Sequence, residues 1–182
     1  MDELLAGLKA IAETTRIRIL FVLSHGELNV SELTFILGQS QPRVSRHLKV
    51  MAEAGLLTRH KEGNWVLFRL RGDGLGGALA RSLVDMLPGH DAELAADLAR
   101  LDTVRQQREQ RAAAYFSENA AQWSELRSLH VDEGNVEQGM RQLVGAGPVG
   151  TLVDLGTGTG RVLELFASQA DDLHGVDASR DM

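Results

Sequence analysis

The sequence predicts a mostly α-helical domain that ends in a β-hairpin, then a helical linker, then the first unit of an α/β domain. Three segments predict this architecture: an amphipathic basic segment that starts at residue 40, two alternating runs around a glycine at 58–70, and a glycine-rich loop between two apolar runs at 151–177. A length of 182 residues is enough for one or two domains.

The segment that starts at Ser40 is expected to form a helix with one apolar and one basic face. At about 100° per residue, three apolar side chains share a face: Val44, Leu48 and Met51. The opposite face carries Arg43, Arg46 and Lys49. Ser40 can cap the helix, and Pro42 suits its first turn. The charges alone would equally suit a solvated face, but the pattern also fits a helix that reads the major groove.

The segment 58–70 is expected to form a basic β-hairpin with its turn at 62–64. Alternation places Trp65, Leu67 and Arg69 on one side and Val66, Phe68 and Leu70 on the other. Basic side chains at 59, 61 and 69 suit a wing that lies against a phosphate backbone. A helix, a turn, a basic helix and a basic hairpin together predict a winged helix-turn-helix.

Charge is distributed unevenly along the chain. The net charge is −6, which taken alone argues against a nucleic-acid partner. Between residues 40 and 71, however, seven Lys or Arg face only two Asp or Glu, whereas from residue 72 onward nine Arg face eighteen acidic residues. A basic patch on an acidic chain predicts a localised DNA-binding surface.

Residues from about 4 to 70 resemble the ArsR (arsenic-repressor-like) transcription regulators. The matching runs are 12–20, 27–33 and 40–48, the last reading Ser-Gln-Pro-Arg-Val-Ser-Arg-His-Leu. The resemblance implies a homodimer that binds a two-fold symmetric operator on double-stranded DNA and usually represses until an effector releases it. His47 is ambiguous, because its family position faces DNA while the helical wheel places it beside the core face. The predicted DNA-binding residues are Ser40, Gln41, Arg43, Ser45, Arg46, His47, Lys49, Arg59, Lys61 and Asn64.

The metal-binding positions of the resembling family are not retained. Arsenic and cadmium sensors carry cysteine where this chain has Asn29 and Ser31, and the chain has no cysteine, which excludes a thiolate site. Asn29 is instead expected to cap the next helix, with Glu32 as its capping-box partner. The other metal site of the family pairs Asp and His along the dimer helix. The candidates for it here are Asp85, His90, Asp91 and Glu93, but Pro88 and Gly89 break any helix between them. We expect no metal, and a metal-responsive repressor with an unorthodox site is the alternative.

The segment 74–87 is expected to form a helix with one apolar stripe, at Leu75, Leu79, Leu83 and Met86. The resemblance implies that this helix pairs with the same helix of a second protomer, and that N-terminal apolar residues at 4, 5, 8 and 11 add to this interface. An apolar stripe that only packs against the core of its own chain is equally compatible with the sequence. Pro88 and Gly89 end the helix and delimit a first domain at 1–88. Residues 89–130 are expected to be a helical linker, one long helix and a shorter one, whose Tyr115 and Trp123 are interpreted as packing rather than ligand-binding residues.

The segment 131–182 is expected to begin an α/β domain. Residues 151–155 suggest a buried strand, 156–160 a glycine loop, 161–170 a helix, and 173–177 a second strand that ends in an acid about twenty positions after the loop. Such a loop brings backbone amides close to a nucleotide, while the acid can bind ribose hydroxyls. Arg161 stands where the dinucleotide fingerprint has Gly or Ala, so a dinucleotide is disfavoured.

The Asp-x-Gly-x-Gly-x-Gly pattern at 154–160 resembles the first motif of class I S-adenosylmethionine-dependent methyltransferases. The order of the segments also resembles fusions of ArsR-type regulators to such domains. The resemblance implies a Rossmann-like fold that binds S-adenosylmethionine or S-adenosylhomocysteine through Asp154, Gly156, Thr157, Gly158, Gly160 and Asp177. Only the start of such a domain is expected here, so no catalytic residue is predicted and enzyme activity stays open. A Rossmann-like unit without a ligand is the alternative.

The sequence therefore predicts a DNA-binding repressor of ArsR type that responds to S-adenosylmethionine or S-adenosylhomocysteine. The alternative is a methyltransferase whose winged helix is an accessory domain. No apolar run approaches the roughly 20 residues of a membrane span, and the N-terminus lacks a signal-peptide pattern. We therefore expect a cytoplasmic protein without a membrane partner.

Overall fold

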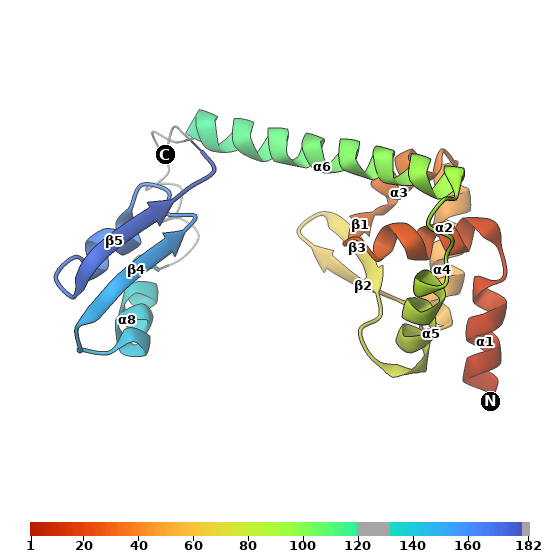
Figure 1. Ribbon diagram of the computed structural model, residues 1–182, viewed down its shortest axis with the longest axis horizontal. Helices are drawn as coiled ribbons and strands as arrows, with labels where there is room; N and C mark the ends of the chain where they lie inside the picture. Colours follow the sequence, from red (N-terminus) through yellow and green to blue (C-terminus); the bar gives the residue numbers. More distant parts are fainter. Residues whose placement is uncertain (120–131, 180–182) are drawn as a thin grey trace. The chain divides into compact units, whose positions relative to one another are not determined.

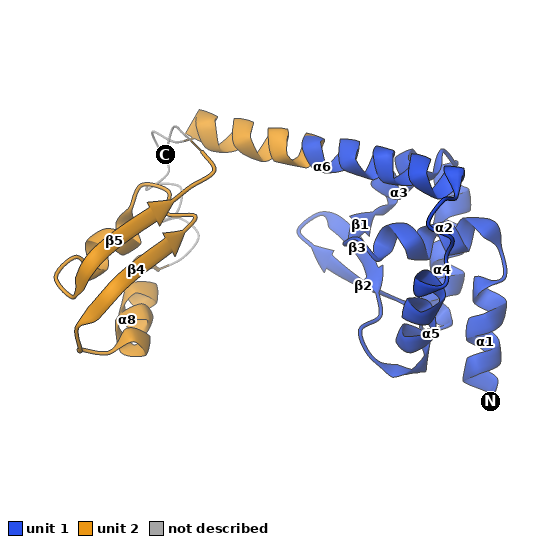
Figure 2. Ribbon diagram, viewed as in Figure 1, with its two compact units in different colours: residues 1–106 blue, residues 107–182 orange. Residues whose placement is uncertain are grey.

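The computed structural model describes residues 1–119 and 132–179, which form two compact units, 1–106 and 107–182 (Figure 2). The elements of the first unit follow one another as α1 (Asp2–Ile11), α2 (Thr14–Leu23), β1 (Leu28–Asn29), α3 (Val30–Leu37), α4 (Gln41–Glu53), β2 (Leu57–Glu62), β3 (Trp65–Leu70) and α5 (Gly74–Asp85) (Figure 1). Helix α6 (Ala92–Asn119) begins in the first unit and ends in the second.

The first unit has the expected helices and hairpin, and its caps follow from local sequence. Asn29 accepts a hydrogen bond from the backbone N–H of Glu32 at 3.0 Å, and the Glu32 carboxylate accepts one from the N–H of Asn29 at 2.8 Å. The predicted capping box of α3 is therefore confirmed. Helix α3 ends at Gly38, whose φ of 64° is in the left-handed region that favours glycine.

The hairpin is part of a three-stranded antiparallel sheet of order β1-β3-β2. Strands β2 and β3 pair from Leu57↔Leu70 to Glu62↔Trp65, and Gly63 in the turn has a φ of 55°. The two-residue strand β1 pairs with the other edge of β3, Leu28 opposite Phe68. Strand β1 was not predicted, because a strand of two residues leaves no alternating pattern in the sequence.

Helices α2, α3 and α4 supply most of the core of the first unit. The fully buried side chains include Ile19, Leu20, Leu33, Ile36, Val44, Leu48, Met51 and Leu56. Helix α5 packs closely against the backbone of neighbouring segments at two of its glycines. A Cβ on Gly76 would collide with the backbone carbonyl of Gly55, and a Cβ on Gly77 with that of Arg71. The glycines that weaken the start of α5 are therefore required for close backbone contact.

The first unit continues to Gln106, beyond the expected domain end at residue 88. Leu101 and Val104 on α6 belong to its core cluster. The buried Arg18 of α2 donates two hydrogen bonds to the carboxylate of Asp97, each at 2.7 Å, and a third to Glu93 at 2.7 Å. The first half of the expected linker is therefore anchored to the winged helix.

The second unit contains α8 (Glu133–Val144), β4 (Val149–Leu155), α9 (Arg161–Phe166) and β5 (Ala170–Val176) (Figure 1). Strands β4 and β5 are parallel, with α9 between them in the chain, as the sequence predicted. The expectation of a buried strand is wrong, because Val153 and Leu155 are 55% and 79% exposed in this two-stranded sheet. Helix α9 ends at Phe166 rather than at the expected residue 170, where β5 begins.

The short helix expected after the long one, with Trp123, lies outside the described residues. Within the described ranges, no helix combines the length and the apolar character that crossing a membrane requires.

Candidate nucleic-acid interface and cofactor half-site

Helix α4 presents a basic face while its apolar face is buried. Val44, Leu48 and Met51 are buried, as predicted from the helical period. The predicted contact residues on the helix are exposed with one exception, and these exposed residues are Gln41, Arg43, Ser45, Arg46 and Lys49. Ser40 stands at the N-cap position, but its side chain makes no capping hydrogen bond, which corrects the predicted cap. Pro42 lies in the first turn as expected.

The exception is His47, which is only 7% exposed. Its Nδ1 lies 3.8 Å from Oε2 of Glu13, the residue that caps α2. Burial lowers the pKa of His47, the Glu13 carboxylate opposes that shift, and Arg16, Arg43 and Arg46 add to it. The structure therefore places His47 on the core side of α4, as the helical wheel indicated, and its contact with DNA stays a prediction.

The carboxylate of Glu13, at the start of α2, also lies close to side chains of helix α4. It accepts a hydrogen bond from the backbone N–H of Arg16 at 2.9 Å and lies 4.0 Å from Nη2 of Arg43. Burial acts to raise the pKa of Glu13, but hydrogen bonds from Arg16 and Thr15 outweigh burial and hold it below its usual value. This role of Glu13 was not predicted, because its partners on α4 come close only after α2 and α4 have packed.

Helix α4 and strand β2 of the wing border a common cavity. A cavity of about 500 Å³ lies between α4 and β2 and is lined by residues that include Ser45, Lys49 and Arg59. Lys49 also lies 3.9 Å from Glu53. Lys61 alternates with His60 along β2 and so projects to the same side as Arg59. The structure therefore brings three of the predicted DNA-binding residues, Ser45, Lys49 and Arg59, to one cavity, while Asn64 is exposed in the hairpin turn.

Arg69 projects from the opposite face of the wing to Arg59 and Lys61. Its Nε donates a hydrogen bond to Oγ1 of Thr58 at 3.3 Å, opposite on β2. Thr58 alternates with Arg59, so Arg69 projects from the face of the wing opposite to Arg59. That second face also carries Glu27, His60 and Glu62, whose grouping the sequence analysis missed because residue 27 is far from residues 60 and 62 along the chain.

The second unit forms the expected glycine loop between β4 and α9. Gly156, Gly158 and Gly160 all have positive φ, at 80°, 51° and 83°. The carboxylate of Asp177 accepts hydrogen bonds from the N–H groups of Gly158 and Ser179, both at 2.8 Å. The Ser179 bond first and the Gly158 bond second lower the pKa of Asp177, so this carboxylate is ionised at neutral pH.

The loop borders a cavity of about 420 Å³ inside the second unit. Gly156, Gly158 and Asp177 line it, together with Glu109 and Phe116 of α6, which the sequence analysis did not assign to a ligand site. Oδ2 of Asp154 is buried and has no hydrogen-bond partner among the described residues. A buried carboxylate oxygen without a partner is energetically unfavourable.

Gly175 on β5 lets the loop approach the strand. A Cβ at Gly175 would lie 2.9 Å from the side chain of Thr157. Thr157 is therefore packed against β5, while Gly160 occupies the N-cap of α9. Of the six predicted cofactor residues, Asp154 lies in β4, Gly156, Thr157, Gly158 and Gly160 lie in the loop, and Asp177 directly follows β5.

Comparison with known proteins identifies the first unit. The family described as "Bacterial regulatory protein, arsR family" matches residues 13–59, from the start of α2 into β2. The arsenical resistance operon repressor of Bacillus subtilis (strain 168) is 33% identical over 76 residues, which are 41% of this chain and 72% of that protein. The chain belongs to the ArsR family.

Two further similarities accompany this assignment to the ArsR family. The arsenical resistance operon repressor of Escherichia coli (strain K12) is 49% identical over 63 residues, 34% of this chain and 54% of the relative. The structure titled "Reduced HlyU from Vibrio cholerae N16961" is 32% identical, covering 47% of this chain and 88% of that one with a TM-score of 0.42. The chain spans about half the length of the first curated relatives, namely 54%, 49% and 55%. Residues of the second unit lie outside the family match.

Proposed function

We propose that the first unit is a sequence-specific DNA-binding repressor of transcription. The observation that carries this proposal is the exposed basic face of α4, which borders one hollow together with Arg59 of the wing. In this arrangement Gln41, Arg43, Ser45 and Arg46 read the major groove, while Lys49, Arg59 and Lys61 bind phosphates. Membership in the ArsR family supports the same role.

The proposed repressor is a homodimer that binds a two-fold symmetric operator. Apolar side chains on α1 and α5 are exposed, among them Leu5, Leu8, Leu75 and Met86. The two helices are in contact, because Gly7 of α1 lies under the side chain of Leu79 of α5. Pairing two copies through this surface would cover these side chains and give the protein the symmetry of a palindromic site.

Replacing Arg46 with alanine tests the recognition face. Arg46 is exposed and has no hydrogen bond or ion pair with a described residue, so its loss leaves the fold intact. We expect operator affinity to fall by about 1–3 kcal/mol, and specificity to relax at one base pair if Arg46 reads a base. Fluorescence anisotropy on duplex DNA from the gene's own upstream region, at two salt concentrations and with random competitor DNA, measures both effects.

Arg111→Ala is the matched control, because Arg111 is an equally exposed arginine in the second unit. It should leave both affinity and salt dependence unchanged. Equal operator affinity of Arg46→Ala and the unmodified chain would mean that the recognition face is misplaced. Binding no tighter than to random DNA would reject the repressor proposal itself.

We further propose that the second unit binds S-adenosylmethionine or S-adenosylhomocysteine and so modulates DNA affinity. The support is the cavity beside the glycine loop, which Asp177 lines, and the buried oxygen of Asp154 on β4, which has no hydrogen-bond partner among the described residues. Asp177 would hold ribose hydroxyls, and the loop glycines would let backbone N–H groups approach the ligand. The alternative, a methyltransferase with an accessory winged helix, predicts methyl transfer that mass spectrometry would detect.

Replacing Asp177 with asparagine should weaken S-adenosylhomocysteine binding about 10-fold or more, because it removes a charged acceptor while it keeps the side-chain shape. Isothermal titration calorimetry of the full chain measures this change. Asp172→Asn is the control, since Asp172 is an exposed residue of β5, the strand that directly precedes Asp177. If the unmodified chain bound neither ligand, or if both variants bound alike, the cofactor proposal would fail while the repressor proposal stood.

A further inference from the structure

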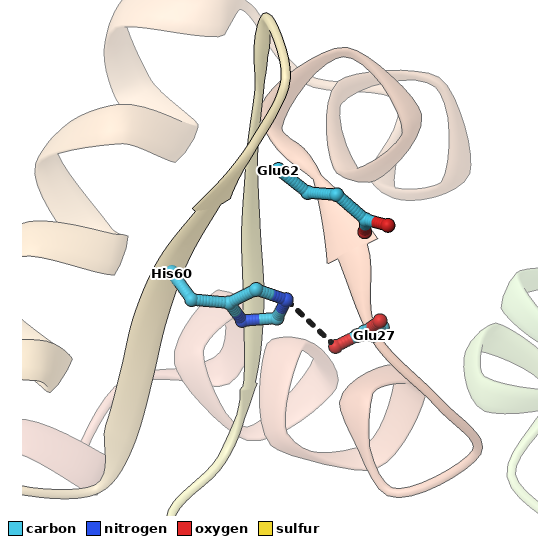
Figure 3. Close-up of side chains that lie close together, drawn as sticks. All are labelled: Glu27, His60 and Glu62. Atoms are coloured by element: carbon cyan, nitrogen blue, oxygen red, sulfur yellow. Dashed lines mark ion pairs between the residues drawn. The ribbon is translucent and has the colours of Figure 1, made fainter. Parts of the chain in front are cut away.

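Three potential metal ligands meet on one face of the β1-β3-β2 sheet (Figure 3). His60 and Glu62 project to the same side of β2 because they are two residues apart, and Glu27 immediately precedes β1 at the other edge of the sheet. Nε2 of His60 lies 3.4 Å from Oε2 of Glu27. One ligand atom from each of the three side chains lies within 4.8 Å of the other two.

We propose that Glu27, His60 and Glu62 bind a divalent transition-metal ion of the Zn²⁺ type. Imidazole nitrogen and carboxylate oxygen are both good ligands for such ions, at about 2.0–2.2 Å for zinc. Atoms that lie within 4.8 Å of one another can converge on a common centre by small side-chain rotations. Three protein ligands leave at least one coordination position for water.

The side chains at this face offer a set of ligands that suits a divalent ion. Two carboxylates and one imidazole converge there. The basic residues of β2, Arg59 and Lys61, alternate with His60 and project from the opposite face. Arg69 shares the face of the cluster, and its Nε donates a hydrogen bond to Oγ1 of Thr58. A divalent ion would neutralise both carboxylates.

The position of His60 fixes which of its nitrogens coordinates. Nδ1 is buried and has no hydrogen-bond partner among the described residues, whereas Nε2 is turned toward Glu27 (Figure 3). The ion would therefore join the chain before β1 to the wing strand β2, across β3. This site departs from the sequence-based expectation of no metal, which considered only thiolates and the Asp and His residues near α5.

The site is separate from the residues proposed to contact DNA, so a direct titration tests it independently of the repressor function. The full chain is freed of metal with a chelator and titrated with Zn²⁺ by isothermal titration calorimetry. Cobalt substitution, followed by visible absorption, reports ligation at the same site. The variants are His60→Gln and Glu62→Gln. His90→Gln is the matched control, because His90 is an exposed histidine among the candidates near α5.

We expect one Zn²⁺ per chain in the unmodified protein and in His90→Gln. Each ligand variant should bind Zn²⁺ about 10-fold more weakly or worse and lose the cobalt absorption. Absence of Zn²⁺ binding, or equal affinity in His60→Gln and the unmodified chain, would overturn the proposal. If His60→Gln failed to fold, the exposed Glu62→Gln would decide alone, and unchanged affinity there would also overturn it.

Discussion

Replacing Asp97 with alanine is expected to destabilise the winged-helix unit by about 3–5 kcal/mol, the usual cost of removing one partner of a buried ion pair. Asp97 is completely buried and accepts two hydrogen bonds from Arg18, each at 2.7 Å. Without the carboxylate, the hydrogen bonds of the Arg18 guanidinium to described residues are reduced to those with the half-exposed Glu93 and the backbone carbonyl of Leu37. Urea denaturation followed by circular dichroism measures the change.

Two further variants make the test of Asp97 specific. Asp102→Ala removes an exposed carboxylate from the same helix, 3.4 Å from Arg105, and should change stability by less than about 1 kcal/mol. The double variant Arg18→Met/Asp97→Leu should recover much of the lost stability, because apolar residues can replace a buried ion pair at little cost. A loss in Asp97→Ala no larger than in Asp102→Ala would show that α6 is not anchored through this pair.

Replacing Gly76 with alanine is expected to destabilise the same unit by about 1–3 kcal/mol through overpacking. The new Cβ would collide with the backbone carbonyl of Gly55, and a backbone atom cannot rotate away as a side chain can. Alanine is otherwise favoured in a helix by up to about 1 kcal/mol, so the collision has to outweigh that gain. Thermal unfolding of the full chain shows whether the substitution lowers or raises the melting temperature.

Gly72→Ala is the control for this position. Gly72 lies just before α5, and a Cβ there would meet nothing within 4 Å. Its substitution should leave stability unchanged or slightly higher, because alanine restricts the unfolded chain. If Gly76→Ala were as stable as Gly72→Ala, the close contact between α5 and the segment at Gly55 would not be required.

The sequence by itself determined the elements whose signals are local. The buried face of α4 follows from the helical period of Val44, Leu48 and Met51, and the hairpin follows from alternation around Gly63. The capping box of Asn29 and Glu32 spans only three residues. The glycine loop before α9 is likewise a short motif with its own backbone requirements. Such patterns were predictable because the interacting groups lie within a few residues of one another.

The tertiary structure alone decided which distant side chains meet. His47 is buried rather than exposed because α2 brings Glu13 beside it, and Asp97 pairs with Arg18 across 79 residues. Glu27 and His60 come together because β1 and β2 flank the same strand. Val153 is exposed because only one strand pairs with β4 in the described unit. Periodicity determines which face of a helix or strand is apolar. The packing of whole elements determines which residues that face contacts, because a short stretch of sequence carries no information about its distant partners.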